Sequence, residues 1–253
     1  MKTQIIIAFL ILNVASTYSQ HERPLIREGN QNYASKVFGN AEVAYRKALE
    51  EKQDSYEAQF NLGNALYKQD KYEKAESELT RLAEKERDKT KLAQIYYNIG
   101  NTQIKSFFLQ SKQKNQQMQM QTQQDSSQQS DPLEPLKKSV ESYKKSLRNN
   151  PLDEEARHNL VLAQKLLNNL QNQQQKQQNK DDKQNKDDKN KDKKDSKDQK
   201  EKEQKEKNEQ QKQQQSIAKE DAQRLLDKLQ NDEKQLQEKL KKQAIRTTTT
   251  KAW

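Results

Sequence analysis

The sequence predicts an all-α protein built as a helix-turn-helix solenoid, and three observations support this fold class. Residue types recur at a spacing of 34 in the first half of the chain, which is the period of a two-helix repeat. The stretch FNLGNALYKQDKYEKAE at 60–76 consists almost entirely of residues that favour helix. Hydrophobic residues make up only 29% of the chain and lie mostly before residue 170, so the folded part is expected to end there.

The first element expected is a signal peptide over residues 1–19. Lys2 gives a short basic start, an apolar run extends from Ile5 to Val14, and the small Thr17 and Ser19 suit a cleavage site. The run is shorter than the roughly 20 residues of an ordinary transmembrane helix. We therefore expect export from the cytoplasm, with an uncleaved membrane anchor or a buried N-terminal helix as the alternatives. The chain contains no cysteine, so packing must stabilise it without disulfides.

Residues 22–170 are predicted to form the repeat domain. The pairs that lie 34 apart are Gly29 and Gly63, Phe38 and Tyr72, Ala41 and Ala75, Tyr45 and Leu79, and Ala48 and Leu82. A third unit begins at YYNIGN (96–101), and its second helix, PLKKSVESYKKSLRNNP, comes about 27 residues late. A polar insertion at 110–130 is expected to open the turn between these two helices. The helix DEEARHNLVLAQKLLNNL is expected to cap the array.

This pattern resembles the tetratricopeptide repeat family, chiefly through Leu62, Gly63, Asn64, Tyr72 and Ala75. The resemblance implies about three repeats followed by the capping helix. In each repeat we expect the glycine of the first helix and the alanine of the second to lie where the two helices come closest. The residues expected to pack the repeats together are Gly29, Ala41, Leu62, Gly63, Tyr72, Ala75, Gly100, Tyr143 and Leu160.

The resemblance also implies a concave groove lined by the first helices, where a peptide or a helix of another protein would bind. The predicted partner-binding residues are Asn30, Tyr33, Glu57, Phe60, Asn64, Tyr67, Lys68, Gln94, Tyr97, Asn101, Lys105, His158 and Lys165. The alternative for the aromatic members is that they fill the interior of the repeats. A clamp for a C-terminal carboxylate is not expected, because Ile26, Gln94 and Asn98 stand where basic residues would be needed.

The sequence does not predict an enzyme. It contains two histidines, His21 and His158, and no cysteine, so we expect no metal site and no cofactor. No phosphate-binding loop or nucleophile motif is present in the sequence, and no small-molecule substrate is expected. The net charge of +10 comes from lysines mixed with acids and glutamines rather than with stacking aromatics, so nucleic acid is not the expected partner. Weak attraction to an anionic envelope surface is more plausible.

Residues 171–215 are predicted to be a disordered Gln/Lys/Asp-rich linker, or a transiently helical one, because they contain no apolar side chain to bury. Residues 216–246 follow as an amphipathic helix, and 247–253 as a flexible tail. The stripe on this helix consists of Ala222, Leu226, Leu229, Leu236 and Leu240. It is short for a coiled coil, and we interpret it as a helix that docks on a partner; the alternative is a marginal helix that is mostly unfolded alone.

The whole layout resembles the tetratricopeptide proteins of the Bacteroides aerotolerance (Bat) operons. The resemblance rests on NNPLDEEARHNLVLAQ, the Gln/Lys-rich run, KEDAQRLLDKLQNDEKQLQEK and the terminal Trp253. It implies a non-catalytic periplasmic scaffold whose partners are membrane-anchored von Willebrand A-type Bat proteins, beside a MoxR-type ATPase, with a role in oxygen tolerance or envelope integrity. Membrane association would come through these partners or through weak charge attraction. The alternative function is a periplasmic chaperone or an accessory subunit of a cell-wall enzyme.

Overall fold

The computed structural model describes residues 22–119, 131–187 and 219–232, together with 234, 235, 238 and 242. The predicted signal peptide, residues 120–130 of the insertion, and the predicted tail at 247–253 lie outside the described residues. Within the described ranges every regular element is a helix, so the predicted all-α class is confirmed there. None of the described helices is long and apolar enough to span a bilayer.

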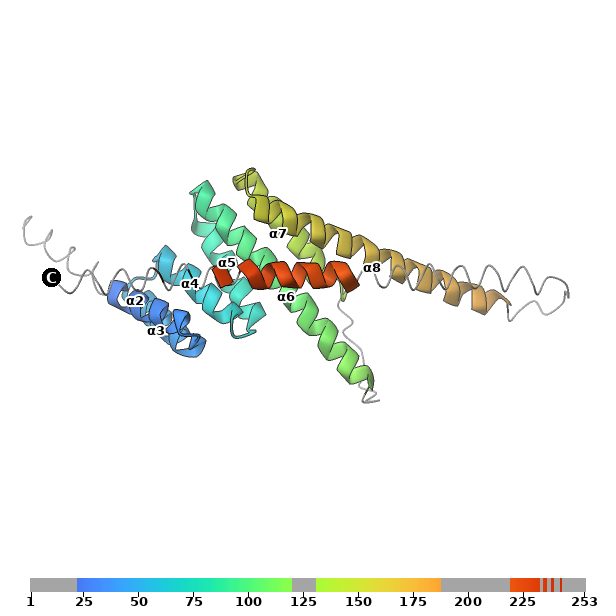
Figure 1. Cartoon of the computed structure of the whole chain (residues 1–253), viewed down its shortest axis with the longest axis horizontal. Coiled ribbons are helices and arrows are strands. Elements are labelled where there is room, and N and C mark those ends of the chain that lie inside the picture. Colours follow the sequence, from blue (N-terminus) through green and yellow to red (C-terminus); the bar gives the residue numbers. More distant parts are fainter. Residues whose placement is uncertain are drawn as a thin grey trace, which may run out of the picture.

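The helices follow one another as antiparallel pairs, and short turns connect them as far as residue 89 (Figure 1). Each helix contacts the next along the chain, and the first helices of neighbouring pairs also contact one another. This pattern is that of the expected helix-turn-helix solenoid. The helices are α2 (Glu22–Ala34), α3 (Phe38–Glu51), α4 (Tyr56–Tyr67), α5 (Tyr72–Lys85), α6 (Lys89–Gln119), α7 (Glu134–Asn149) and α8 (Glu154–Asp187).

Local side chains set where the helices begin and where the turns form. The Ser55 hydroxyl accepts a hydrogen bond from the amide of Ala58 at the start of α4. Asp88 and Asp153 accept amide hydrogen bonds in the same way at the starts of α6 and α8, which satisfies donors that a helix leaves unpaired. The turns within the first two pairs each contain one residue with positive φ, Lys36 at 64° and Asp70 at 57°. These two residues also lie 34 apart, so the turn geometry repeats with the helices.

The glycines of α2, α4 and α6 lie against large side chains of the second helix in their own pair. A Cβ atom on Gly29 would lie 2.3 Å from Tyr45 Cε1, and one on Gly63 would lie 2.7 Å from Leu79 Cδ2. Gly100 faces Tyr143 in the same way, at 2.7 Å from Cε1. The side chain nearest to an added Cβ at each of these glycines is therefore a tyrosine or a leucine rather than the alanine of the second helix. The missing Cβ makes room for a tyrosine ring or a leucine, which then fills the interior between the helices.

The other packing residues lie in the expected interior. Ala41 and Ala75 are fully buried on the second helices. Leu160 is half-buried against the cluster formed by α6, α7 and α8. The predicted packing residues that are buried are Gly29, Ala41, Leu62, Gly63, Tyr72, Ala75, Gly100 and Tyr143.

Polar contacts join the first pair of helices to the second. The Glu42 carboxylate of α3 accepts hydrogen bonds from Lys71 Nζ and Gln69 Nε2, both at 2.9 Å, and from Arg46. Burial opposes the charged form, but these donors outweigh it and lower the pKa of Glu42 to about 2 from 4.5. The carboxylate therefore stays charged at neutral pH and connects α3 to the α4–α5 turn.

Two helices extend further than the sequence predicts. α6 continues through the start of the polar insertion to Gln119, and α8 continues to Asp187, so residues 171–187 of the predicted linker are helical. The physical reason is that both segments grow from a helix already held by packing. Once a helix is nucleated, each further Gln or Lys adds a hydrogen bond at little cost.

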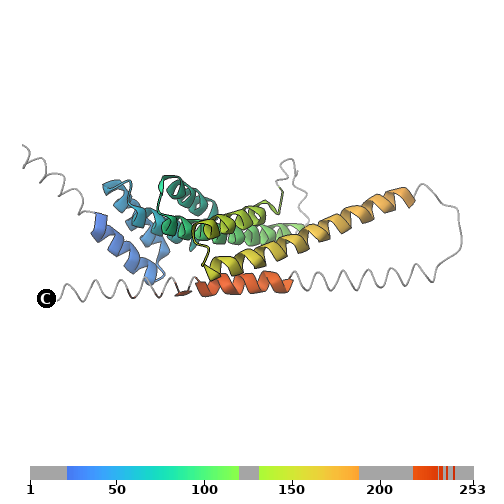
Figure 2. The ribbon, with the colours of Figure 1, turned by 90° about the horizontal axis from the view of Figure 1, so that it is seen from above.

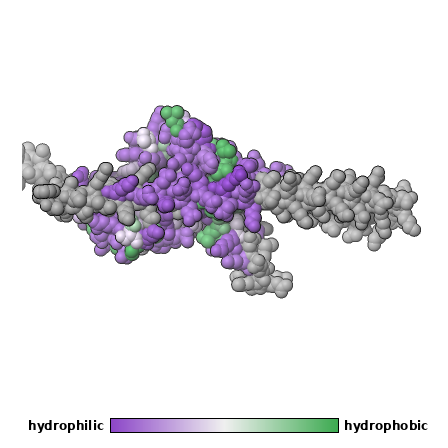
Figure 3. All heavy atoms as spheres, viewed as in Figure 1, coloured by the Kyte–Doolittle hydropathy of each residue, from purple (hydrophilic) through white to green (hydrophobic). Residues whose placement is uncertain are grey.

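Residues 219–232 form a helix that lies beside α8 (Figures 1 and 2). Its buried face contains Leu225 and Leu229, both fully buried. The predicted stripe placed Leu226 on this face, but Leu226 is half-buried and Leu225 takes its place. Leu236 and Leu240 lie outside the described residues. The outward face of the molecule in Figure 3 is hydrophilic over most of the described surface.

We expect Gly63→Leu to lower the free energy of unfolding by about 1–3 kcal/mol, because the added side chain must displace Leu79 from a packed interface. Thermal and urea denaturation would measure this loss. Gly39→Leu is the matched control, since the nearest atom to an added Cβ is Gln69 Oε1 at 3.9 Å. It should keep or raise the stability because leucine has the higher helix propensity. Equal losses in the two variants would contradict the close-contact account.

Candidate partner-binding groove

A groove with a volume of about 440 Å³ runs along the first helices of the solenoid. α2, α4 and α6 supply most of its lining, Asp153 and Glu155 at the start of α8 supply acidic side chains, and Asp232 and Gln235 also contribute. The lining residues are Tyr33, Phe60, Asn64, Tyr67, Lys68, Gln94, Tyr97, Asn98, Asn101, Thr102, Asp153, Glu155, Asp232 and Gln235.

Most of the predicted partner-binding residues lie in this groove. Those that line it are Tyr33, Phe60, Asn64, Tyr67, Lys68, Gln94, Tyr97 and Asn101. The other five predicted residues do not line it. Asn30 is buried beneath the lining, Glu57 and His158 are exposed, Lys105 is half-buried, and Lys165 on α8 forms an ion pair with Asp221.

The sequence reasoning missed six lining residues for different reasons. Asn98 occupies the same place in its repeat as Asn61, two residues before the glycine, so the repeat pattern carried a signal for it. Asp153 and Glu155 come from the start of α8, and Asp232 and Gln235 come from a segment remote in sequence. Their position depends on how distant helices pack, which no local pattern specifies.

A ladder of asparagines runs along the groove from one repeat to the next, and some of its members line the groove. Asn61 Nδ2 donates to Asn30 Oδ1 at 3.0 Å, and Asn98 Nδ2 donates to Asn64 Oδ1 at 2.8 Å. In both pairs the donor lies two residues before the glycine, and the acceptor lies one residue after the preceding glycine. The ladder therefore fixes the register of one first helix against the next.

The ladder continues into the capping helix. Asn159 Nδ2 on α8 lies 3.5 Å from Asn101 Oδ1, and Asn159 stands two residues before Val161, which replaces the expected glycine. Tyr143 also donates to Asn101 Oδ1, at 2.7 Å, as Tyr45 does to Asn30 Oδ1. The tyrosines that face Gly100 and Gly29 thus also support the asparagines that follow these glycines.

Asn64 differs from the other acceptors of the ladder. The side chain that faces the preceding glycine, Gly63, is Leu79, where the other two pairs have a tyrosine, and leucine has no hydroxyl to donate. Asn64 is 5% exposed, and within the described residues its Nδ2 has no hydrogen-bond acceptor. A buried donor without an acceptor costs about 1–3 kcal/mol. Because Asn64 lines the groove, a bound group with an oxygen acceptor would recover this energy.

Tyr97 is a hydrogen-bond donor at the end of the groove. Burial raises its pKa well above the ordinary value, and the hydrogen bond to Asp232 and the charge of that carboxylate raise it further. The phenol therefore stays protonated and donates to Asp232 Oδ2. Asn159 Nδ2 approaches the same oxygen at 3.5 Å. A carboxylate at this point thus meets two donors.

Residues 33–99 match the tetratricopeptide repeat family model. The match runs from the end of α2 through α3, α4 and α5 into α6. The predicted tetratricopeptide repeats are therefore confirmed over this segment, which includes most of the groove lining. No curated protein matches the chain. Among the described residues, no group of three or more histidines and carboxylates lies close enough to hold a metal ion.

We expect Asn30→Ala to destabilise the tetratricopeptide repeats by about 1–3 kcal/mol, because the buried Tyr45 hydroxyl and Asn61 amide lose their common acceptor. The melting temperature measured by circular dichroism would report this loss. Gln31→Ala is the matched control, as Gln31 is the exposed neighbour on the same helix. Melting temperatures that fall equally in both variants, or in neither, would show that the ladder does not hold the repeats.

Proposed function

We propose that the protein is a non-catalytic scaffold that binds a segment of a partner protein in the groove. The observation that carries this proposal is the buried amide donor of Asn64, which has no acceptor among the described residues and belongs to a groove bordered by aromatic side chains. Tetratricopeptide repeats form extended concave surfaces that bind other proteins, and the matched segment contains Asn64.

The chemistry of the groove suits a peptide segment. Phe60 and Tyr67 offer apolar area on one helix, and Phe60 stacks on Tyr56 with ring centroids 5.6 Å apart. A ring fixed in this way loses little further freedom when a partner binds. The Asn64 amide is suited to a backbone carbonyl or carboxylate oxygen of the segment.

The finer proposal is that the protein is of the BatC type and works in the periplasm. The support is the resemblance in layout to the tetratricopeptide proteins of Bat operons, together with the repeat match at 33–99. Its partners would then be membrane-anchored von Willebrand A-type Bat proteins, in a complex linked to oxygen tolerance or envelope integrity. An uncleaved signal segment would instead attach the protein to the inner membrane.

The competing proposal is a periplasmic chaperone or an accessory subunit of a cell-wall enzyme. In that case the basic charge of the chain, +10 overall, would attract it to anionic envelope polymer. Such binding would weaken sharply with added salt and would not depend on the aromatic side chains of the groove.

We expect the double variant Phe60→Ala/Tyr67→Ala to lose partner capture at least 10-fold, since aromatic anchors carry much of the energy of protein interfaces. The measurement is co-purification of the tagged full chain from the native envelope, with quantitative mass spectrometry of what it retains. The matched control is Val43→Ala/Val161→Ala, which trims two apolar side chains that are 52% and 56% exposed elsewhere. Capture that survives in the groove variant and disappears in high salt would favour the competing proposal.

A further inference from the structure

We propose that the surface of α6 and α8 that holds residues 219–232 is a second docking site, and that its external ligand is an acidic amphipathic helix of a partner protein. The chain's own helix is then an intramolecular competitor for that ligand. We call this surface the helix seat. This inference deepens the proposed scaffold function, because it names the kind of partner and a means of regulating its access.

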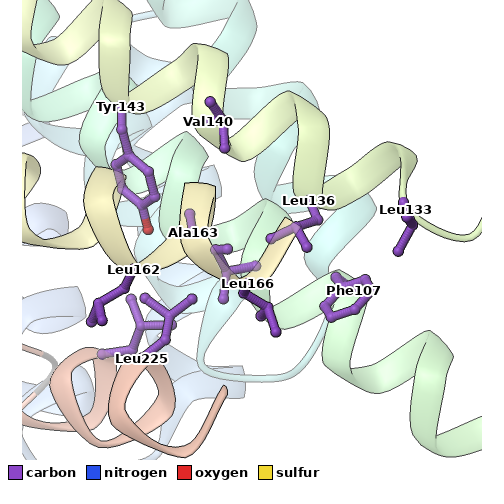
Figure 4. Packing of buried hydrophobic residues seen from close by; sticks show 11 residues of the cluster. Phe107, Leu133, Leu136, Val140, Tyr143, Leu162, Ala163, Leu166 and Leu225 are labelled. Carbon is purple, nitrogen blue, oxygen red and sulfur yellow. The ribbon is translucent and has the colours of Figure 1, made fainter. Parts of the chain in front are cut away.

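The apolar part of the helix seat accepts two leucines spaced by one helical turn. Leu225 and Leu229 are both fully buried, in one cluster with Ile104 of α6 and Leu166 of α8. Figure 4 shows Leu225 directed at Leu162 and Leu166. Burying two leucine side chains removes a large apolar area from water, which offsets the cost of ordering the helix. The pair is therefore the main source of affinity.

The polar part of the helix seat binds one carboxylate at each end of the leucine pair. Asp221 is 1% exposed; its Oδ1 lies 2.9 Å from Lys165 Nζ, and its Oδ2 accepts from Asn169 Nδ2 at 3.1 Å. At the other end, Asp232 accepts from Tyr97 and lies near Asn159. A buried carboxylate needs such donors to offset its lost hydration.

These contacts define the ligand as a helix with the pattern Asp-x3-Leu-x3-Leu-x2-Asp. The helical period places all four side chains on one face. The opposite face imposes no requirement, because Gln223, Asp227 and Gln230 are exposed. A partner helix with this pattern would meet the same apolar cluster and the same donors.

The position of the helix indicates a ligand rather than a further element of the solenoid. α8 already covers α7 and carries the asparagine ladder to its end at Asn159. Asp232 and Gln235 line the partner-binding groove itself, so the helix seat is continuous with that groove. A partner that fills the groove towards α8 must therefore contact or displace this helix.

Attachment to the same chain favours the internal helix over a partner in solution. An intramolecular ligand acts at an effective concentration that the length and stiffness of its linker determine. A free helix of equal intrinsic affinity must exceed that concentration to compete. Weakening the internal helix should therefore raise the affinity for an external one by a factor that can be measured.

The test uses a fluorescent synthetic peptide with the sequence of residues 216–235 and measures its binding to the full-length protein by anisotropy. The variant Leu225→Asp/Leu229→Asp should bind the peptide at least 10-fold more tightly than the wild type, because its own helix no longer competes. The matched control is Gln223→Asp/Gln230→Asp, which places the same charges on the exposed face and should bind as the wild type does. Adding Lys165→Glu to the leucine double variant should abolish this gain in affinity for the peptide.

Equal affinities of the leucine double variant and the wild type for the peptide would overturn the proposal. Circular dichroism checks that the solenoid of the leucine double variant still folds. If it does not, the milder Asp221→Asn/Asp232→Asn variant replaces it, and this variant should bind the peptide several-fold more tightly than the wild type. A concentration-dependent dimer of the wild type that the leucine variant lacks would mean that the external ligand is a second copy, which also contradicts the proposal. Loss of partner capture by Phe60→Ala/Tyr67→Ala reports on the groove alone, so the two proposals fail separately.

Discussion

The close approach of two helices at a glycine is the contact on which the rest of the structure depends. At Gly29 and Gly100 the space left by the missing Cβ is filled by a tyrosine, and at Gly63 it is filled by Leu79. The two tyrosine hydroxyls then donate to the asparagines that follow the glycines. One position thus determines both the spacing of the helices and the orientation of the asparagine amides along the groove.

The departure in the middle repeat has a functional consequence. Because Leu79 has no hydroxyl, Asn64 is supported by Asn98 alone, and its own amide group keeps an unpaired donor among the described residues. The packing requirement at Gly63 is met by leucine as well as by tyrosine. The polar requirement is not met among the described residues, and the residue with the unsatisfied donor lines the groove in which a partner segment would lie.

The sequence predicted most of the fold because the repeat is local. The 34-residue spacing located the helix pairs, the late second helix at Glu134–Asn149 and the small residues between helices. It did not show that Gly63 faces Leu79 rather than an alanine, since a period identifies equivalent positions but not the distance between them. It also placed the start of the linker too early, because composition alone does not reveal that α8 nucleates the helical segment up to Asp187.

The groove was predicted only in part, for a related reason. Phe60, Tyr67 and Tyr97 follow from the repeat, whereas Asp232 reaches the groove from a helix that follows a long polar stretch. The amphipathic pattern indicated that this helix would dock, but it did not identify the docking surface. Lys165 was predicted to contact a partner, and in the structure its contact is Asp221 of the same chain.

Hydrogen exchange of the full-length protein, followed by mass spectrometry, tests the occupied helix seat most directly. The account predicts slow exchange of the amides of residues 219–232, comparable to that of the first turns of α8. An excess of the 216–235 peptide should remove this protection while α6 and α8 stay protected. Fast exchange over residues 219–232 in the protein alone would contradict the account, since the helix would then not occupy the end of the groove.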